Sequence, residues 1–347
     1  MSLTHALYDD KSFVRDACAP EYLRFEITFT KALMSSESLT DVRPPVIIKD
    51  HAPKGITPRS VGAMLMLAVM WGLSIPVTKL GLESLPPLTL TAMRFAIAVP
   101  LLLVFAVGRN PLPRRALPRV AALGVLGIGI GQVAQTFGVS GTSASVGTII
   151  SATIPVFIVF FAALRLKQHV SGWQKLGLLA AFTGIALVAF ARGHGTTGVS
   201  GTSVGGAFCV LLSALAIAFY YVWSVELTTA YGTATVAAWS TLFGFLALLP
   251  WAAWEMWRVP FHITTPGISA AAYLGLIVTV AGLFLWLNLL RHVPARVAAS
   301  VQFLQPVFGI ATASMMFGDR LGPSFVVGVA LVLIGLAFSM TSRGGAR

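Results

Sequence analysis

The sequence predicts an all-α membrane protein with ten transmembrane helices, arranged as two inverted five-helix repeats. Three observations carry this prediction: the composition, a series of apolar segments, and an internal repeat. Hydrophobic residues make up 56% of the 347 residues and charged residues only 10%, and the mean hydropathy is +0.83. A soluble chain of this length needs far more charge to cover its surface. We therefore expect most of the chain to lie in a bilayer.

The apolar segments predict how the chain is divided. A stretch of about 18 or more apolar residues is long enough to span a bilayer as a helix. Polar, proline or glycine clusters separate ten segments, at 60–80, 87–107, 119–138, 143–165, 172–191, 204–226, 234–254, 268–290, 296–317 and 323–341. Residues 1–58 are mixed polar sequence with scattered prolines, so we expect a disordered cytoplasmic tail there. Residues 342–347 form a second short tail.

The basic residues predict the orientation of the chain in the membrane. If the N-terminus is cytoplasmic, the loops outside keep only Arg192, Arg258, Arg320 and the span-end Lys79, while all other basic loop residues lie inside. Basic residues favour the cytoplasmic side, so we expect a multi-pass protein of the plasma (cell inner) membrane with both termini in the cytoplasm. The net charge of +12 is spread over span ends, which argues against nucleic acid as a partner.

An internal repeat relates the two halves of the chain at an offset of 151 residues. Pro155-Val156-Phe157 aligns with Pro306-Val307-Phe308, and Gly177 and Gly184 align with Gly328 and Gly335. We therefore predict a first repeat at 59–192 (spans 1–5) and a second at 203–341 (spans 6–10). Because five is odd, the second copy enters the membrane in the opposite sense. Inverted repeats of this kind are typical of secondary transporters, whose substrate site lies between the halves.

Two stretches of the sequence resemble a known family. The segment "AVMWGLSIPVTKLGLESLPPLTLTAMRFAIA" is similar to the start of an EamA domain, and "RVAASVQFLQPVFGIATASMMFGDRLGP" to the end of a second copy. The resemblance covers about residues 60–341. It implies the drug/metabolite transporter superfamily, with ten helices, cytoplasmic termini and, commonly, export of amino acids or related metabolites. Where the family commonly has a Glu-Arg pair, this chain has Gln168-His169 in the first copy and Asp319-Arg320 in the second.

Two cations in or near the apolar segments need an explanation. Lys79 lies near the outer end of span 1, and Arg94 lies about 10 Å into span 2 at 1.5 Å per residue. An isolated charge at that depth is costly, so we expect Arg94 to face protein or water. One interpretation is a structural cluster of Lys79, Arg94 and the nearest acid, Glu83. The other is a binding site for an anion near the outer surface.

Prolines and glycines mark two further features of the repeats. Pro155 in span 4 and Pro306 in span 9 each remove one helix hydrogen bond, so we expect a kink at both. The kinks either shape the packing or act as hinges for alternating access. The aligned pairs Gly177/Gly184 and Gly328/Gly335 are expected to allow close helix packing in spans 5 and 10.

Polar side chains form short stripes on three spans. Gln132 and Gln135 lie three residues apart on span 3, and Gln302 and Gln305 lie three apart on span 9. Residues at this spacing share a helix face, and an amide in hydrocarbon needs a partner, so these faces point inward. They either join helices or line a substrate cavity. A third stripe on span 1 consists of Trp71, Ser74 and Thr78, and the same hypothesis includes Trp71, Tyr220 and Asn288.

The remaining patterns exclude most other classes of protein. The six histidines do not lie at mid-span, the cysteines Cys18 and Cys209 have no metal spacing, and no catalytic motif is present. We therefore expect neither an enzyme nor a cofactor or metal. From residue 56 onward the only acids are Glu83, Glu226, Glu255 and Asp319, all at span ends or in loops, so we expect no proton coupling through a buried carboxylate.

The function that fits best is a secondary transporter or exporter of small metabolites, such as amino acids, related compounds or drugs, working by alternating access. Two alternatives remain from other classes. One is a flippase for a lipid-linked molecule, which needs a lateral opening and a basic pocket. The other is a membrane scaffold or sensor that transports nothing.

Overall fold

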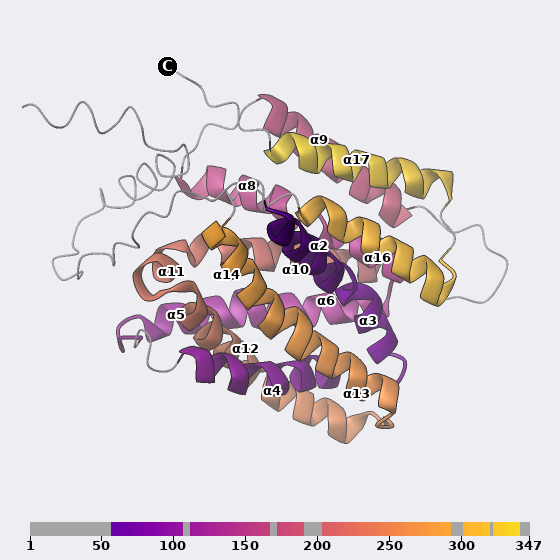
Figure 1. Cartoon of the computed structure of the whole chain (residues 1–347). Coiled ribbons are helices and arrows are strands. Elements are labelled where there is room, and N and C mark those ends of the chain that lie inside the picture. The colour runs from indigo at the N-terminus through magenta and orange to yellow at the C-terminus, as the bar shows by residue number, and fades with distance from the viewer. Residues whose placement is uncertain are drawn as a thin grey trace, which may run out of the picture. The chain divides into compact units, whose positions relative to one another are not determined.

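The computed structural model describes residues 57–106, 112–166, 172–190, 203–292, 301–319 and 322–340, and all regular structure in these ranges is helical (Figure 1). The N-terminal tail predicted for residues 1–58 lies outside the described residues up to residue 56. The first half contains α2 (Pro58–Gly72), α3 (Ser74–Gly81), α4 (Pro87–Ala106), α5 (Leu117–Leu123), the π-helix η1 (Gly124–Gly129), α6 (Ile130–Ser140), α7 (Ala144–Ser151), α8 (Ile154–Leu166) and α9 (Gly172–Phe190). The second half contains α10 (Val204–Trp223), α11 (Val225–Tyr231), α12 (Thr233–Arg258), α13 (Thr265–Ala272), η2 (Tyr273–Ala281), α14 (Gly282–His292), α16 (Val301–Phe317) and α17 (Pro323–Met340).

Seven helical segments of the described residues are long and apolar enough to cross a membrane. They are Pro58–Gly81, Pro87–Ala106, Leu117–Ser140, Ala144–Arg165, Val204–Trp223, Thr233–Arg258 and Thr265–Leu289. Two shorter apolar helices follow at Leu304–Phe317 and Pro323–Phe338. The chain is therefore a multi-span helical protein, and the count of ten spans stays a prediction.

The internal repeat is visible in how the helices are interrupted. The first span breaks at Leu73, between α2 and α3, and α10 ends at Ser224, which lies 151 residues later. Within its described residues, each half also contains one π-helix. Moved by 151 residues, the bounds of η1 become 275 and 280, which lie inside η2. The two halves thus share irregularities of the backbone as well as residues.

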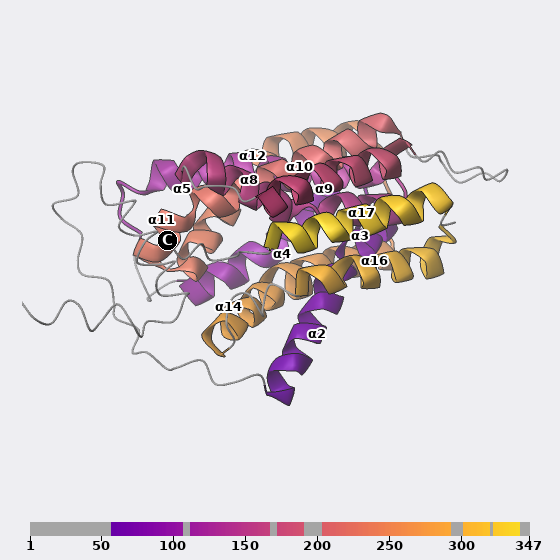
Figure 2. The same ribbon diagram turned by 90° about the horizontal axis from the view of Figure 1, so that it is seen from above.

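The pairing of α9 with α17 has the direction that an inverted repeat predicts. These equivalent helices lie side by side in both views (Figure 1 and Figure 2). A Cβ on Gly184 would lie 2.6 Å from the carbonyl oxygen of Gly328, and one on Gly335 would lie 2.5 Å from that of Gly177. The predicted close packing through these glycines is confirmed. Since residue numbers rise along one helix as they fall along the other, α9 and α17 are antiparallel, as an inverted repeat requires.

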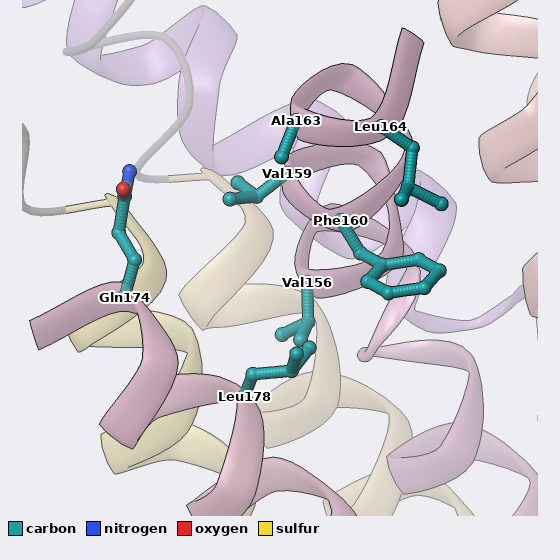
Figure 3. A pocket seen from close by; sticks show the side chains of 7 residues that line it. All are labelled: Val156, Val159, Phe160, Ala163, Leu164, Gln174 and Leu178. Atoms are coloured by element: carbon teal, nitrogen blue, oxygen red, sulfur yellow. The ribbon is translucent and has the colours of Figure 1, made fainter. Parts of the chain in front are cut away.

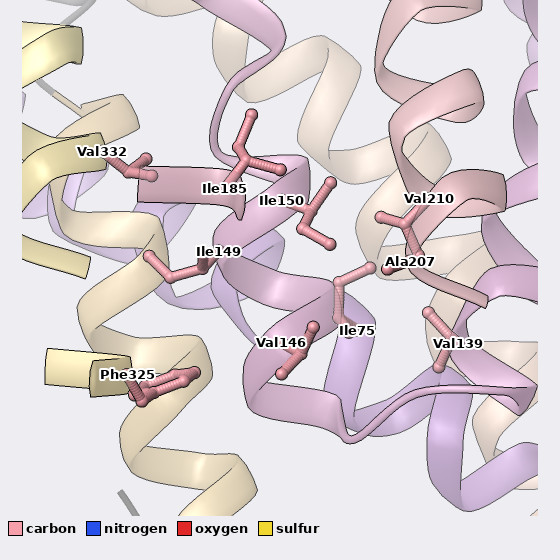
Figure 4. Packing of buried hydrophobic residues seen from close by; sticks show 10 residues of the cluster. All are labelled: Ile75, Val139, Val146, Ile149, Ile150, Ile185, Ala207, Val210, Phe325 and Val332. Carbon is pink, nitrogen blue, oxygen red and sulfur yellow. The ribbon is translucent and has the colours of Figure 1, made fainter. Parts of the chain in front are cut away.

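A cluster of apolar side chains surrounds α7 where both halves meet (Figure 4). Ile149 and Ile150 of α7 have no exposed surface, and side chains of α3, α6, α9, α10 and α17 pack around them. Close packing of this kind replaces lipid contacts with protein contacts and holds helices together in a bilayer. α7 is therefore packed against helices of both halves.

The two prolines expected to kink their helices behave differently. A break at Ala152 and Thr153 separates α7 from α8 just before Pro155, which lacks the N–H that would continue the helix. By contrast, α16 continues through Pro306 without interruption. An interruption of the helix therefore accompanies Pro155 only, while the kink expected at Pro306 and a hinge role for either proline stay predictions.

Candidate functional site

Arg94 on α4 joins the two halves through neutral side chains. Its Nε donates to Thr279 Oγ1 at 3.0 Å, and its Nη1 donates to Gln132 Oε1 at 2.6 Å. Gln132 lies on α6 of the first half, and Thr279 lies in η2 of the second. The Thr279 hydroxyl in turn donates to Leu274 O, five residues earlier, at 2.8 Å. The wider turn of the π-helix thus fixes the hydroxyl that orients the guanidinium. Such π-turns are frequent at functional sites.

Trp71 contacts the same π-helix one residue away. Its Nε1 donates to Val278 O at 3.2 Å, and its ring lies 5.8 Å from that of Trp286 at an angle of 44°. An indole N–H in hydrocarbon needs an acceptor, and this carbonyl supplies it. Trp71 at the end of α2 and Arg94 on α4 therefore bind adjacent residues of η2.

The other glutamines of the stripes have different surroundings. Gln305 on α16 lies where α16 crosses α2, since a Cβ on Gly72 would lie 2.8 Å from Gln305 O. The side-chain Nε2 of Gln305 is buried and has no hydrogen-bond partner in the described part of the chain. Gln135 and Gln302 are half-buried. The structure thus brings together Trp71, Gln132 and Arg94, with Gln305 next to Gly72, and no hydrogen bond between described residues joins Gln135 or Gln302 to them.

Two weaker candidates lie elsewhere. Tyr220 packs against Gly127 of η1, much as Trp71 packs beside η2, and its ring lies 6.0 Å from that of Tyr221. Its neighbours are apolar residues of α5, α11 and α12. Asn288 is exposed on α14. Neither is part of the contacts around Arg94.

Among the described residues, no hydrogen bond or ion pair joins Arg94 to Lys79 or Glu83. Lys79 Nζ instead donates to three backbone carbonyls, of Val139 at 2.9 Å, Ser140 at 3.2 Å and Thr142 at 2.7 Å. The last carbonyls of a helix have no partner within it and carry a partial negative charge, so a cation is stabilising there. Lys79 therefore caps α6, Arg94 binds the neutral groups described above, and Glu83 is exposed.

Three acids make contacts between the halves that the sequence did not predict. Glu255 Oε2 of α12 accepts from both Thr89 N at 2.8 Å and Thr89 Oγ1 at 2.9 Å, at the first turn of α4. Although Glu255 is near a span end, as expected, its side chain is buried. Asp319 Oδ2 accepts from Ser145 N at 2.9 Å, at the start of α7. Carboxylates are favoured at such helix N-termini, where N–H groups lack partners.

The third acid, Glu226 of α11, forms an ion pair with Arg165 at the end of α8. Arg165 Nη1 also donates to Val222 O at 2.8 Å, and the guanidinium lies 5.2 Å from the Trp223 ring centre. All these partners belong to the second half, and Arg165 belongs to the first. The sequence shows that these acids and arginines lie at span ends, but it does not show which helix ends they contact.

A pocket of about 140 Å³ lies between α8 and α9 (Figure 3). Its lining is apolar apart from Gln174 at one edge, and comprises Val156, Val159, Phe160, Ala163, Leu164 and Leu178. None of the predicted polar residues lines it. Its surface suits hydrocarbon chains and offers few groups for a polar metabolite. Among the described residues, no group of three His, Cys, Asp or Glu could hold a metal ion.

These features define a multi-span helical membrane protein built from two related halves, with polar contacts between them. The chain belongs to the EamA-like transporter family, whose model matches residues 59–190 and 204–341. The family resemblance noted in the sequence is thus confirmed.

Individual relatives are distant. An "uncharacterized transporter" of Archaeoglobus fulgidus is 24% identical over 81% of this chain and 98% of its own length. A "probable terminal-alkyne amino-acid exporter" of Streptantibioticus cattleyicolor is 27% identical over 80% of this chain and 92% of its own. The "uncharacterized inner membrane transporter YedA" of Escherichia coli is 25% identical over 82% and 90%. One crystal structure, 16% identical, matches with a TM-score of 0.56 over 81% of this chain and 96% of that one, which indicates a shared fold.

Proposed function

We propose that the chain is a secondary transporter that moves a small metabolite of the amino-acid type across the cell inner membrane by alternating access. The family and the relatives support a membrane transporter, and one relative's name refers to amino-acid export. The observation that carries the proposal is the contact of Arg94 with Gln132 of the first half and Thr279 of the second. Inverted-repeat transporters bind substrate between their halves, where such polar groups converge.

Substitution of Gln305 by leucine tests this placement of the site. A buried amide that loses its ligand contact typically costs about 1–3 kcal/mol, roughly ten- to a hundredfold in affinity. We expect Gln305→Leu to weaken uptake of amino acids in a liposome counterflow assay by about that factor. Leucine also removes an amide nitrogen that is buried without a hydrogen-bond partner among the described residues, so the variant should be at least as thermally stable as the wild type.

The matched control is Gln174→Leu, the same change at the edge of the pocket between α8 and α9. It should transport normally. If Gln305→Leu transports as well as the wild type, or loses activity only through loss of stability, Gln305 is a packing residue and the site lies elsewhere.

The orientation can be tested directly. Both termini are proposed to be cytoplasmic, because this orientation places most of the basic loop residues in the cytoplasm, the side that such residues favour. Reporter fusions after residues 113, 196 and 345 should report inside, outside and inside, respectively. A fusion after residue 345 that reports a periplasmic location contradicts this orientation.

The positions of the acids bear on whether transport is coupled to protons. Glu255 already holds the N-terminus of α4 and Asp319 that of α7, while Glu226 pairs with Arg165. We propose a facilitator or exchanger that does not depend on protons. In liposomes, an imposed pH gradient alone should produce no uphill accumulation of a substrate that exchanges readily, and accumulation under that gradient shows the opposite.

A further inference from the structure

Arg94 is a buried cation that has no acidic partner among the described residues. The side chain is only 9% exposed, within the span Pro87–Ala106. All four acids of residues 57–347 lie in the described ranges, and none pairs with it. Glu226 binds Arg165, Glu255 binds Thr89, Asp319 binds Ser145 and Glu83 is exposed.

The partners that Arg94 does have leave its charge uncompensated. A guanidinium carries donors on all three nitrogens. Here Nε and Nη1 bind neutral oxygen atoms of Thr279 and Gln132, and Nη2 has no hydrogen-bond partner in the described part of the chain. Neutral acceptors orient a cation but do not neutralise it. A charge buried within a membrane span is costly unless an opposite charge joins it.

We infer, building on the proposed transport function, that Arg94 binds the carboxylate of the substrate. Arginine matches a carboxylate with two parallel hydrogen bonds, and such pairs are strongest away from water. Gln132 and Thr279 are positioning residues that hold the guanidinium so that its Nη2 side faces the ligand. Because they come from opposite halves, the bound carboxylate lies at the contact between the repeats.

The surroundings favour a carboxylate over a more highly charged anion. Lys79, the cation near the outer end of span 1, already binds carbonyls at the end of α6. The polar groups that bind Arg94 are the amide of Gln132 and the hydroxyl of Thr279, which are both neutral. One cation with neutral neighbours matches a single negative charge, so this site selects metabolites that carry one carboxylate.

The test compares each amino acid with its own carboxamide, which has nearly the same shape but lacks the negative charge. The purified full-length protein is heated with each of the proteinogenic L-amino acids and with the matching amides, and unfolding is followed by tryptophan fluorescence. We expect some acids to stabilise the wild type with affinities at least about tenfold higher than their amides, which corresponds to about 1.4 kcal/mol. The inference is overturned if no acid is preferred over its amide.

Three variants separate recognition of charge from a structural role. Arg94→Gln should abolish the preference for acids. Arg94→Lys, which keeps the charge but lacks the planar fork, should retain the preference with weaker binding. Arg258→Gln removes an exposed cation outside the site and should behave as the wild type. If Arg94→Gln folds and still prefers acids over amides, the inference is overturned. If Arg94→Gln does not fold, the comparison of acids with amides on the wild type is the deciding test.

Liposome transport keeps the two proposals separate. If amides are transported as well as acids, the proposed transport function stands and the role of Arg94 is wrong. If no compound is transported while acids still bind in preference to amides, the carboxylate site stands and the proposed function is wrong.

Discussion

Replacing Gly309 by alanine is expected to reduce both transport and stability sharply, although it adds a single methyl group. A Cβ at this position would lie 2.5 Å from Thr148 Cγ2 and 2.8 Å from the carbonyl oxygen of Gly72. These atoms belong to α7 and α2, which both pack against α16. A backbone carbonyl cannot rotate away as a side chain can, so the helices must move apart.

Overpacking of this kind typically costs about 1–3 kcal/mol. The crossing of α2 and α16 also sets the separation of Trp71 and Gln305, so we expect the transport rate in liposomes to fall at least tenfold, together with a lower unfolding temperature. The control is Gly62→Ala, the same change on α2 at a position where no other helix of the described residues comes within 4 Å of the added Cβ. Wild-type transport and stability in Gly309→Ala contradict the assigned role of this crossing.

The division of the chain into repeats could be predicted because it leaves a mark in the sequence. The prolines and glycines shared at an offset of 151 residues reflect backbone constraints that recur in both halves. The pairing of Gly184 with Gly328 and of Gly335 with Gly177 gives the physical reason for four of these residues. Apolar content likewise predicted spans, because a bilayer imposes a length on every helix that crosses it.

The polar contacts could not be predicted in the same way. Thr89 and Glu255 lie 166 residues apart, and Ser145 and Asp319 lie 174 apart, so their pairing depends on how the helices pack. The π-helices left no signal either, because their apolar pattern differs little from that of an α-helix. The cluster around Arg94 was assigned to Glu83 because that acid is nearest in sequence, whereas the actual partners come from α6 and η2.

Helical spacing located the glutamines on inward faces but did not distinguish their roles. Gln132 and Gln135 share a face of α6, yet only Gln132 reaches Arg94. On α16, Gln305 has a buried amide nitrogen, whereas Gln302 is half-buried three residues earlier. A difference of one turn along a helix changes which neighbouring helix a side chain meets, and this information is not present in a single sequence.

Cross-linking the halves at either end of the span Ala144–Arg165 is expected to stop transport completely. Ser145 at one end binds Asp319, and Arg165 at the other end binds Glu226, so two contacts between the halves lie about 30 Å apart along one span. Both contacts are formed in this structure, so the two halves are joined at both ends of this span at the same time. Alternating access requires each end to open in turn while the other stays closed.

The experiment uses two double-cysteine variants in a background without Cys18 and Cys209, one with Ser145→Cys and Asp319→Cys, the other with Arg165→Cys and Glu226→Cys. Oxidation, or a short cleavable cross-linker, should abolish counterflow in each variant, and a reductant should restore it. Single-cysteine variants treated identically should be unaffected. If a contact between the halves never opens, a covalent cross-link at that contact does not reduce transport. Full transport in a completely cross-linked variant therefore means that this end never opens, and that substrate crosses the membrane by another route.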